Sequence, residues 1–427
     1  MRVLAFLLAV PLLTAVLATA DPLVKPDQYE PPEYCKPCHQ ALFEQWHGTM
    51  HSHASEEPFY GRMFTLASKE TNGLTDTFCS RCHTPVGLLA GEIPPADHSK
   101  LSPISRNGVF CDFCHTIKGQ EGTGNARYIV DPGQVKRGPF GDSDPLVHKA
   151  EFSKLHTDPE FCGTCHDVSH PVNNLPLETT YTEWKAGPYN TGDPATRTIC
   201  QDCHMTPGPG VTKPNPGKAS EVAGERPHIF THDPVGGGGI SALLGEEETF
   251  RAATERLRAA AELTLHLPGA VGPGAEVSVG VDVTNVGCGH RLPTGLTEIR
   301  QMWLEVIVKD AAGKELFASG LLNDQGEIRE GSVVYHTVVA DADGKPTPKF
   351  WLAASKLSDQ RIPPKETAKE TFEFRVPAGT TGPLSVDVRL LYRAASPSVL
   401  GLALPAEDAA RLPTIEMTTA HGAVAVE

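Results

Sequence analysis

Cys35-Lys-Pro-Cys38-His39 is the first of five copies of the pattern Cys-x-x-Cys-His in this 427-residue chain. The four later copies keep the same spacing and read Cys79-Ser-Arg-Cys82-His83, Cys111-Asp-Phe-Cys114-His115, Cys162-Gly-Thr-Cys165-His166 and Cys200-Gln-Asp-Cys203-His204. Two thiols three positions apart on a helical turn can both reach the vinyl groups of one porphyrin and form thioethers, and the adjacent histidine can then bind the iron. The repeats therefore predict five covalently attached haem c groups.

Two other uses of paired cysteines compete with this interpretation. A single Cys-x-x-Cys can be half of a zinc site or a redox-active dithiol. However, all but one of the 11 cysteines belong to the five repeats, and each repeat ends in histidine. This regularity favours haem attachment over zinc binding or disulfides. The remaining cysteine, Cys288, is expected to be a buried thiol.

Residues 1–20 have the composition of a secretory signal peptide. Arg2 provides a positive charge, residues 4–17 are mostly apolar, and Ala18-Thr19-Ala20 matches the small-x-small pattern that precedes a cleavage site. We expect the mature chain to begin at Asp21 and to be periplasmic or extracellular. An uncleaved membrane anchor is the alternative, but the apolar run is short for a membrane span, and no later segment approaches that length.

The length of the chain suits two domains, and the haem-attachment repeats show where the first one lies. All five repeats fall within residues 21–240, for which we expect a mostly α-helical and irregular multihaem cytochrome domain. Its end, residues 207–240, is rich in proline and glycine, which disfavour regular structure. Apolar residues at helical spacing then predict a linker helix over residues 241–262.

Residues 263–427 change from helical to alternating hydrophobicity. Apolar residues alternate with polar or small ones over 277–283, 303–308, 371–376 and 384–390. Glycine- and proline-bearing turns separate these segments, which is typical of antiparallel strands. We therefore expect an all-β, immunoglobulin-like sandwich that carries no haem-attachment repeat and acts as a docking or structural module.

The surroundings of the first repeat resemble a known family. Cys35-x-x-Cys38-His39 is followed by Trp46-His-Gly-Thr49-Met-His51-Ser-His-Ala54, which resembles the opening of the multihaem cytochromes related to the tetrahaem cytochrome of ammonia oxidisers. The later repeats and their flanks are similar to the same group at residues 108–115, 161–168 and 200–205. The resemblance covers residues 30–232 and implies closely stacked haems that serve as an electron conduit. The fifth repeat and the β-domain depart from the family's pattern and leave the physiological role open.

Each haem iron has a second axial position, and a second histidine there suits electron transfer. The resemblance implies that His51 fills one such position. His148 and His156 precede the fourth repeat and His228 follows the fifth, and each is a candidate ligand. For His148 and His156 the alternative is a hydrogen-bonding role near a haem propionate, and His232 is the local competitor of His228.

His290 is a candidate ligand outside the haem-binding part. It lies in Gly287-Cys288-Gly289-His290-Arg291-Leu292-Pro293-Thr294-Gly295, a loop between predicted strands, where it could be an ordinary turn residue. The Gly-His-x-Leu-Pro-Thr-Gly pattern resembles one found where such β-domains accompany multihaem domains, which implies that His290 caps a haem and links the domains. The expected second ligands are thus His51, His148, His156, His228 and His290.

Three functions are compatible with these features. Electron transfer is the leading interpretation, with other cytochromes or a terminal reductase as redox partners. The formal net charge of −15 argues against nucleic acid as a partner and is compatible with basic redox proteins. A reductase of a small nitrogen or sulfur oxyanion would need one open haem, and the Cys-x-x-Cys-Lys variant of the pentahaem nitrite reductases is absent. A subunit of a haem filament would need a ligand donated between chains.

Overall fold

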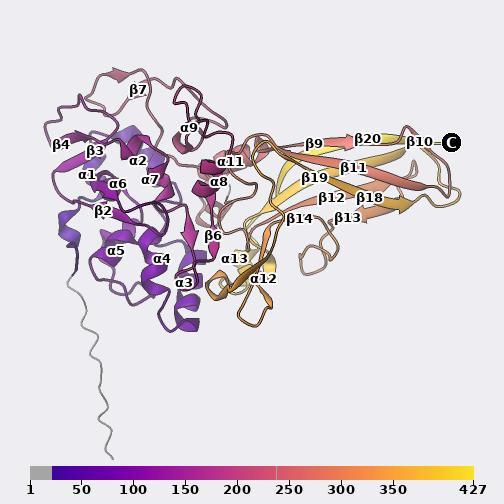
Figure 1. The fold of residues 1–427 in the computed structure, drawn as a ribbon, viewed down its shortest axis with the longest axis horizontal. Coiled ribbons are helices and arrows are strands. Elements are labelled where there is room, and N and C mark those ends of the chain that lie inside the picture. The colour runs from indigo at the N-terminus through magenta and orange to yellow at the C-terminus, as the bar shows by residue number, and fades with distance from the viewer. Residues whose placement is uncertain (1–21, 237) are drawn as a thin grey trace, which may run out of the picture.

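The structure is a computed structural model that describes residues 22–236 and 238–427. The expected signal peptide, residues 1–20, lies outside the described residues. Figure 1 shows a part built of short helices and loops, coloured indigo to magenta, beside an elongated sheet-rich part coloured orange to yellow. Within the described residues, no helix combines the length and the apolar character that a membrane span requires.

Short helices, short strand pairs and long loops make up the first part. Its helices are α1 Pro32–Cys35, α2 Gln40–His47, α3 Pro58–Glu70, α4 Asp76–His83, α5 Pro85–Leu89, α6 Cys111–Thr116, α7 Glu160–Gly163, α8 Thr180–Ala186 and α9 Cys200–His204. Its paired strands are β1 Ile117–Gln120 with β2 Tyr128–Val130, β3 Val135–Gly138 with β4 Lys149–Phe152, β5 Val168–Ser169 with β6 Pro176–Glu178, and β7 Gly217–Lys218 with β8 Glu225–Arg226. Apart from α3, these helices are too short to be stable without tertiary packing.

The linker between the two parts differs from the single helix expected over residues 241–262. α10 Ser241–Leu244 ends at Gly245, which adopts a left-handed conformation with φ of 76°, and α11 Glu247–Arg258 follows. Glycine ends helices in this way because it lacks the Cβ atom that makes the conformation costly. The expected linker helix is therefore wrong in its bounds: it is two helices, and strand β9 already begins at Ala261.

Two larger sheets form most of the second part. One has the strand order β10-β20-β19-β12-β13 with β14 also paired to β12, the other has the order β18-β11-β9, and a smaller sheet has the order β16-β15-β17. The bounds are β9 Ala261–His266, β10 Ala270–Val271, β11 Glu276–Asn285, β12 Gln301–Lys309, β13 Glu315–Ser319, β14 Val334–Tyr335, β15 Thr337–Ala340, β16 Pro346–Thr347, β17 Ser355–Asp359, β18 Thr367–Arg375, β19 Leu384–Arg393 and β20 Ile415–Val426. Two short helices, α12 Pro397–Leu400 and α13 Ala406–Ala409, precede β20. The four alternating segments of the sequence fall in β11, β12, β18 and β19, as predicted.

The two larger sheets share one hydrophobic core. Val279 and Val281 of β11 are fully buried in the same cluster as Leu304 of β12 and Val388 of β19. Every second residue of β11 is buried, which places one face of its sheet against the other sheet. This core makes the second part a rigid support for the loops at its end.

An apolar contact joins the two parts of the chain. Met63 of α3 belongs to the same buried cluster as Ile299, Trp351 and Leu400 of the sheet-rich part. The backbone carbonyl of Trp351 also accepts a hydrogen bond of 3.0 Å from the Nε2 atom of His170. His170 therefore has a structural role at this junction.

Replacement of Leu304 by alanine is expected to lower the free energy of unfolding by about 2–5 kcal/mol, because it leaves a cavity between the sheets. Chemical denaturation of the purified holoprotein measures this loss. Leu357→Ala is the matched control, since Leu357 is 52% exposed, and it should change stability by less than about 0.5 kcal/mol. Equal losses in the two variants would contradict the assignment of the core.

Candidate functional site

The five haem-attachment repeats lie on short helices or at their ends. The second, third and fifth repeats lie within α4, α6 and α9, and the first and fourth begin on α1 and α7. The backbone N–H of His39 donates to the carbonyl of Cys35 at 3.0 Å, and that of His166 donates to the carbonyl of Cys162 at 2.9 Å. Even these two repeats therefore have the helical turn that places both thiols and the imidazole around one porphyrin. All the cysteines of the repeats are free and partly accessible.

Three of the predicted second ligands face a histidine of a repeat. The ring centres are 6.3 Å apart for His39 and His148, 6.1 Å for His51 and His166, and 6.2 Å for His204 and His290. A metal–imidazole bond is about 2 Å long, so two imidazoles on opposite sides of one metal ion have ring centres roughly 6 Å apart. The three pairs therefore fit a haem iron between their rings.

His115 of the third repeat has two histidine neighbours. The ring centre of His232 lies 6.2 Å away and that of His156 lies 5.7 Å away. Both nitrogens of His156 are already engaged, with Nδ1 2.8 Å from the Ser153 hydroxyl and Nε2 3.1 Å from the Cys114 carbonyl. In His232, by contrast, Nδ1 makes a hydrogen bond with the carbonyl of Phe230, and Nε2 has no hydrogen-bond partner among the described residues. The geometry therefore favours His232 over the expected His156.

His228 does not face a histidine of any repeat in the described part of the chain. Its Nδ1 atom accepts a hydrogen bond of 3.0 Å from the backbone N–H of Asn215, and its ring lies edge-on to Phe230. The backbone N–H of Thr231 donates to the carbonyl of Met205, which holds this segment beside the fifth repeat. This segment places His232 opposite His115, whereas the His228 ring is held by its hydrogen bond with Asn215.

His83 of the second repeat has a different neighbour. Its ring stacks on Tyr60 of α3 with ring centres 3.9 Å apart, and among the described residues no second imidazole is paired with it across a gap of 6 Å. Beyond Tyr60 lies His98, whose Nε2 atom is buried without a hydrogen-bond partner. Sequence reasoning did not single out Tyr60, because an aromatic residue in an amphipathic helix is usually a core residue.

Several of the paired histidines are in the neutral state that an iron ligand requires. Burial lowers the pKa of His51, His204 and His232 to about 4. Burial also lowers the pKa of His115 and His290. These imidazoles are therefore neutral at physiological pH, and a neutral imidazole can donate its free nitrogen to a metal.

The Nδ1 atom of each repeat histidine has a hydrogen-bond partner that fixes its ring. For four of them the partner is a backbone carbonyl: that of Ala219 for His39, Ala54 for His83, Arg137 for His115 and Val235 for His204. For His166 it is the side-chain carboxylate of Glu178, at 3.1 Å. Burial opposes a charge on His166, yet Glu178 raises its pKa to about 9. Sequence reasoning did not single out Glu178, because this residue belongs to no recognisable motif.

A buried ion pair holds the His290 loop against the haem-binding part. Glu183 of α8 pairs with Arg361 at 2.5 Å, and both side chains are almost fully buried. The same carboxylate accepts hydrogen bonds from the backbone N–H of Arg291 at 3.0 Å and from the Thr294 hydroxyl at 3.1 Å. Glu183 therefore ties the segment that directly follows His290 to α8.

Cys288 lies outside the five repeats. Burial raises the pKa of Cys288 to about 12, so this residue stays a protonated thiol, in keeping with the expected structural role.

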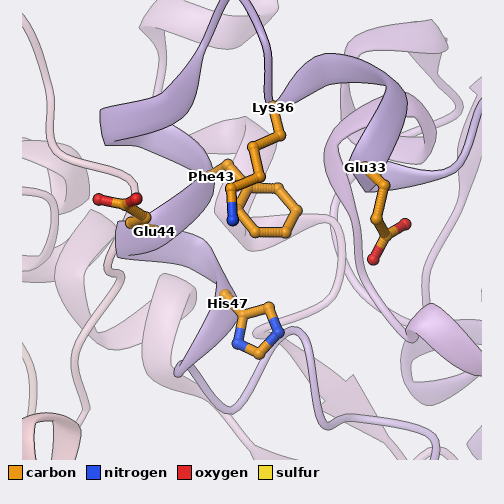
Figure 2. A pocket seen from close by; sticks show the side chains of 5 residues that line it. All are labelled: Glu33, Lys36, Phe43, Glu44 and His47. Atoms are coloured by element: carbon orange, nitrogen blue, oxygen red, sulfur yellow. The ribbon is translucent and has the colours of Figure 1, made fainter.

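A surface hollow beside the first repeat is lined by Glu33, Lys36, Phe43, Glu44 and His47 (Figure 2). None of the repeat cysteines or repeat histidines lines this hollow, and we assign it no role in haem binding.

Glu183→Ala is expected to lower the free energy of unfolding by about 3–5 kcal/mol, because it leaves Arg361 buried without a partner. Denaturation of the holoprotein measures the loss. Glu276→Ala is the control, since Glu276 pairs with Arg375 on the surface, and such pairs contribute about 0–1 kcal/mol. A loss no larger than that of the control would show that the buried pair does not hold the loop.

Known proteins resemble this chain in sequence over its beginning and in fold over most of its length. The family model described as cytochrome c554 and c-prime matches residues 34–116. No curated protein matches the chain. The structure is similar to that of a penta-heme cytochrome c552 from Thermochromatium tepidum, with a TM-score of 0.65 and 21% identity over 94% of this chain and 100% of that chain. At this identity the likeness is one of fold.

A second solved structure shows only a weak likeness to this chain. A CARDB domain of the PF1109 protein from Pyrococcus furiosus aligns with 39% of this chain and 87% of its own, at 14% identity and a TM-score of 0.19, too low to carry an argument. The first three repeats lie within the matched residues 34–116, and the fold of the c552 structure extends over nearly the whole chain. The family match and the shared fold together support a multihaem c-type cytochrome.

Proposed function

We propose that this protein is an exported electron-transfer protein that carries electrons along five covalently bound haem c groups. The observation that carries the proposal is the pairing of four repeat histidines with a second histidine at a distance that fits one iron. Two histidine ligands leave no open position on an iron, which suits electron transfer rather than substrate binding. The haem supplies the redox chemistry, and the protein supplies attachment, orientation and electrostatics.

The proposed ligand set follows from the geometry above. The thioether bonds would form at Cys35, Cys38, Cys79, Cys82, Cys111, Cys114, Cys162, Cys165, Cys200 and Cys203. The first ligands would be His39, His83, His115, His166 and His204. The second ligands would be His148, His51, His232 and His290, on the irons of the first, fourth, third and fifth repeats. His156 would instead orient the third repeat through its hydrogen bond to the Cys114 carbonyl.

Contacts between two of the repeats support a connected electron path. His51 faces His166 of the fourth repeat, and three residues later the carbonyl of Ala54 accepts a hydrogen bond from Nδ1 of His83 of the second repeat. The second and fourth haems would therefore lie close together.

The purified holoprotein is expected to carry five haems and to show mostly low-spin ferric signals with two imidazole ligands. Intact mass measures the number of attached haems, and low-temperature EPR of the oxidised protein reports the ligands. Export can be checked from the N-terminus of the mature protein, expected at Asp21. A mass lower by one haem or more would refute the count of five, and mainly high-spin signals would refute the conduit.

Replacement of His232 by alanine should convert one haem from low-spin to high-spin, because the third iron loses its second ligand. His156→Ala is the matched control, since both rings lie near His115, and it should leave the low-spin signals in place. EPR and visible spectra of the two variants measure this difference. If His156→Ala produces the high-spin haem and His232→Ala does not, the ligand of the third iron is His156.

Reduction of a small nitrogen or sulfur oxyanion is the second candidate, and the surroundings of His83 favour it. No second histidine pairs with this ring among the described residues, and Tyr60 and the buried Nε2 atom of His98 lie nearby. Tyr60 and His98 would supply polar groups beside an open haem, which suits a small polar ligand. A high-spin EPR signal that disappears on addition of nitrite or sulfite would favour this function, and five low-spin haems would exclude it.

The sheet-rich part is proposed to be an immunoglobulin-like sandwich that acts as a docking or structural module. Its loop carrying His290 would complete the ligands of the fifth haem and fix one part of the chain to the other. Redox partners would be other cytochromes or a terminal reductase in the periplasm or outside the cell. Assembly into a filament would require a histidine donated by a second chain, and the iron of the second repeat is the one that would receive it.

A further inference from the structure

The repeat histidines differ in one respect that bears on their haems. Four of them place Nδ1 against a neutral backbone carbonyl, whereas His166 places it 3.1 Å from the Oε1 atom of Glu178. The side chain of Glu178 is only 17% exposed. The fourth repeat is therefore the one whose first ligand is held by a charged group.

A short strand pair directly after the fourth repeat places Glu178 next to His166. Strand β5 begins two residues after His166 and pairs with β6, with Val168 opposite Glu178. This pairing brings Glu178, twelve residues later in the chain, back beside His166. Arg300 contributes a further nearby charge from the sheet-rich part, but the hydrogen-bond partner of Glu178 is His166.

A carboxylate has a defined effect on a metal-bound imidazole. It attracts the Nδ1 proton, which increases the negative charge on the ring and makes the other nitrogen a stronger donor to the metal. A stronger donor stabilises ferric over ferrous iron, which lowers the reduction potential of that haem. A backbone carbonyl has no net charge and has a smaller effect.

We infer that Glu178 gives the haem of the fourth repeat the lowest reduction potential of the five. This inference rests on the proposed function and adds an energetic order to it. The second and fourth repeats lie close together, because His51 faces His166 and the carbonyl of Ala54 accepts a hydrogen bond from Nδ1 of His83. An electron that moves from the second haem to the fourth would therefore take an uphill step.

The test is Glu178→Gln in the full holoprotein, because glutamine keeps the size and an acceptor oxygen but removes the charge. Spectroelectrochemical titration is expected to show one midpoint potential moving upward while the other four move less. The EPR signal of one low-spin haem should change with it, and that signal should be the one lost in His51→Ala. A uniform shift of all five haems, or no shift, would overturn the inference.

Glu160→Gln is the matched control. Glu160 begins α7, the helix that opens the fourth repeat, and its carboxylate accepts a hydrogen bond from the Tyr181 hydroxyl at 2.9 Å rather than from an imidazole. Removal of this charge should raise the potential of the same haem less and leave its EPR signal unchanged. An equal rise and an equal spectral change in the control would show that the effect is general electrostatics, which would overturn the role of the hydrogen bond.

The outcomes also separate this inference from the proposed function. Intact mass of each variant confirms haem loading before the potentials are compared. Wild-type protein with fewer than five haems would refute the proposed function itself. Five haems with an unmoved fourth potential would refute only the role of Glu178. If the glutamine variant loses a haem, Glu178→Asp serves instead, with a smaller rise expected in the same haem and no rise counting against the inference.

Discussion

The spacing between paired imidazoles constrains most of the haem-binding part. Each pair joins a short helix to a segment that arrives from elsewhere in the chain, and ring centres 6.1 to 6.3 Å apart leave room for one metal ion. Helices of four to eight residues have little stability of their own. The apolar faces of bound haems would supply the surface that these helices lack. Loops can then be long here, because the ligands rather than regular structure fix their positions.

Buried charged residues orient the His290 loop and the ring of His166. Glu183 pairs with Arg361 and binds the His290 loop at Arg291 and Thr294, and Glu178 holds the ring of His166. Buried charges need such partners, because each one has lost its hydration. The core between the two larger sheets supports the arrangement, since β11 and β12, which flank the loop, are anchored in one cluster. The two strands thus fix the ends of the loop whose His290 faces His204.

Sequence reasoning predicted the features that depend on local spacing. The spacing of the Cys-x-x-Cys-His repeats places three side chains on one helical turn, and the alternating pattern of β11 places its apolar residues on one face of a sheet. It expected His156 and His228 as ligands and set His232 aside as the competitor of His228, because the choice depends on which rings face a repeat histidine and which ring nitrogens are already hydrogen-bonded. It missed the break at Gly245, where one glycine outweighs the helical pattern on both sides. Glu178 and Tyr60 were beyond it, because only the folded chain brings them to a repeat.

The position of His290 has a consequence for biogenesis. A chain that crosses a membrane from its N-terminus delivers all five repeats well before the loop between β11 and β12. Haem attachment to Cys200 and Cys203 can therefore precede the arrival of the residue that faces His204. The fifth iron would stay accessible until the β-part has folded and docked through Glu183 and Arg361. In the exported protein proposed above, closure of that iron would therefore coincide with the completed folding of both parts of the chain.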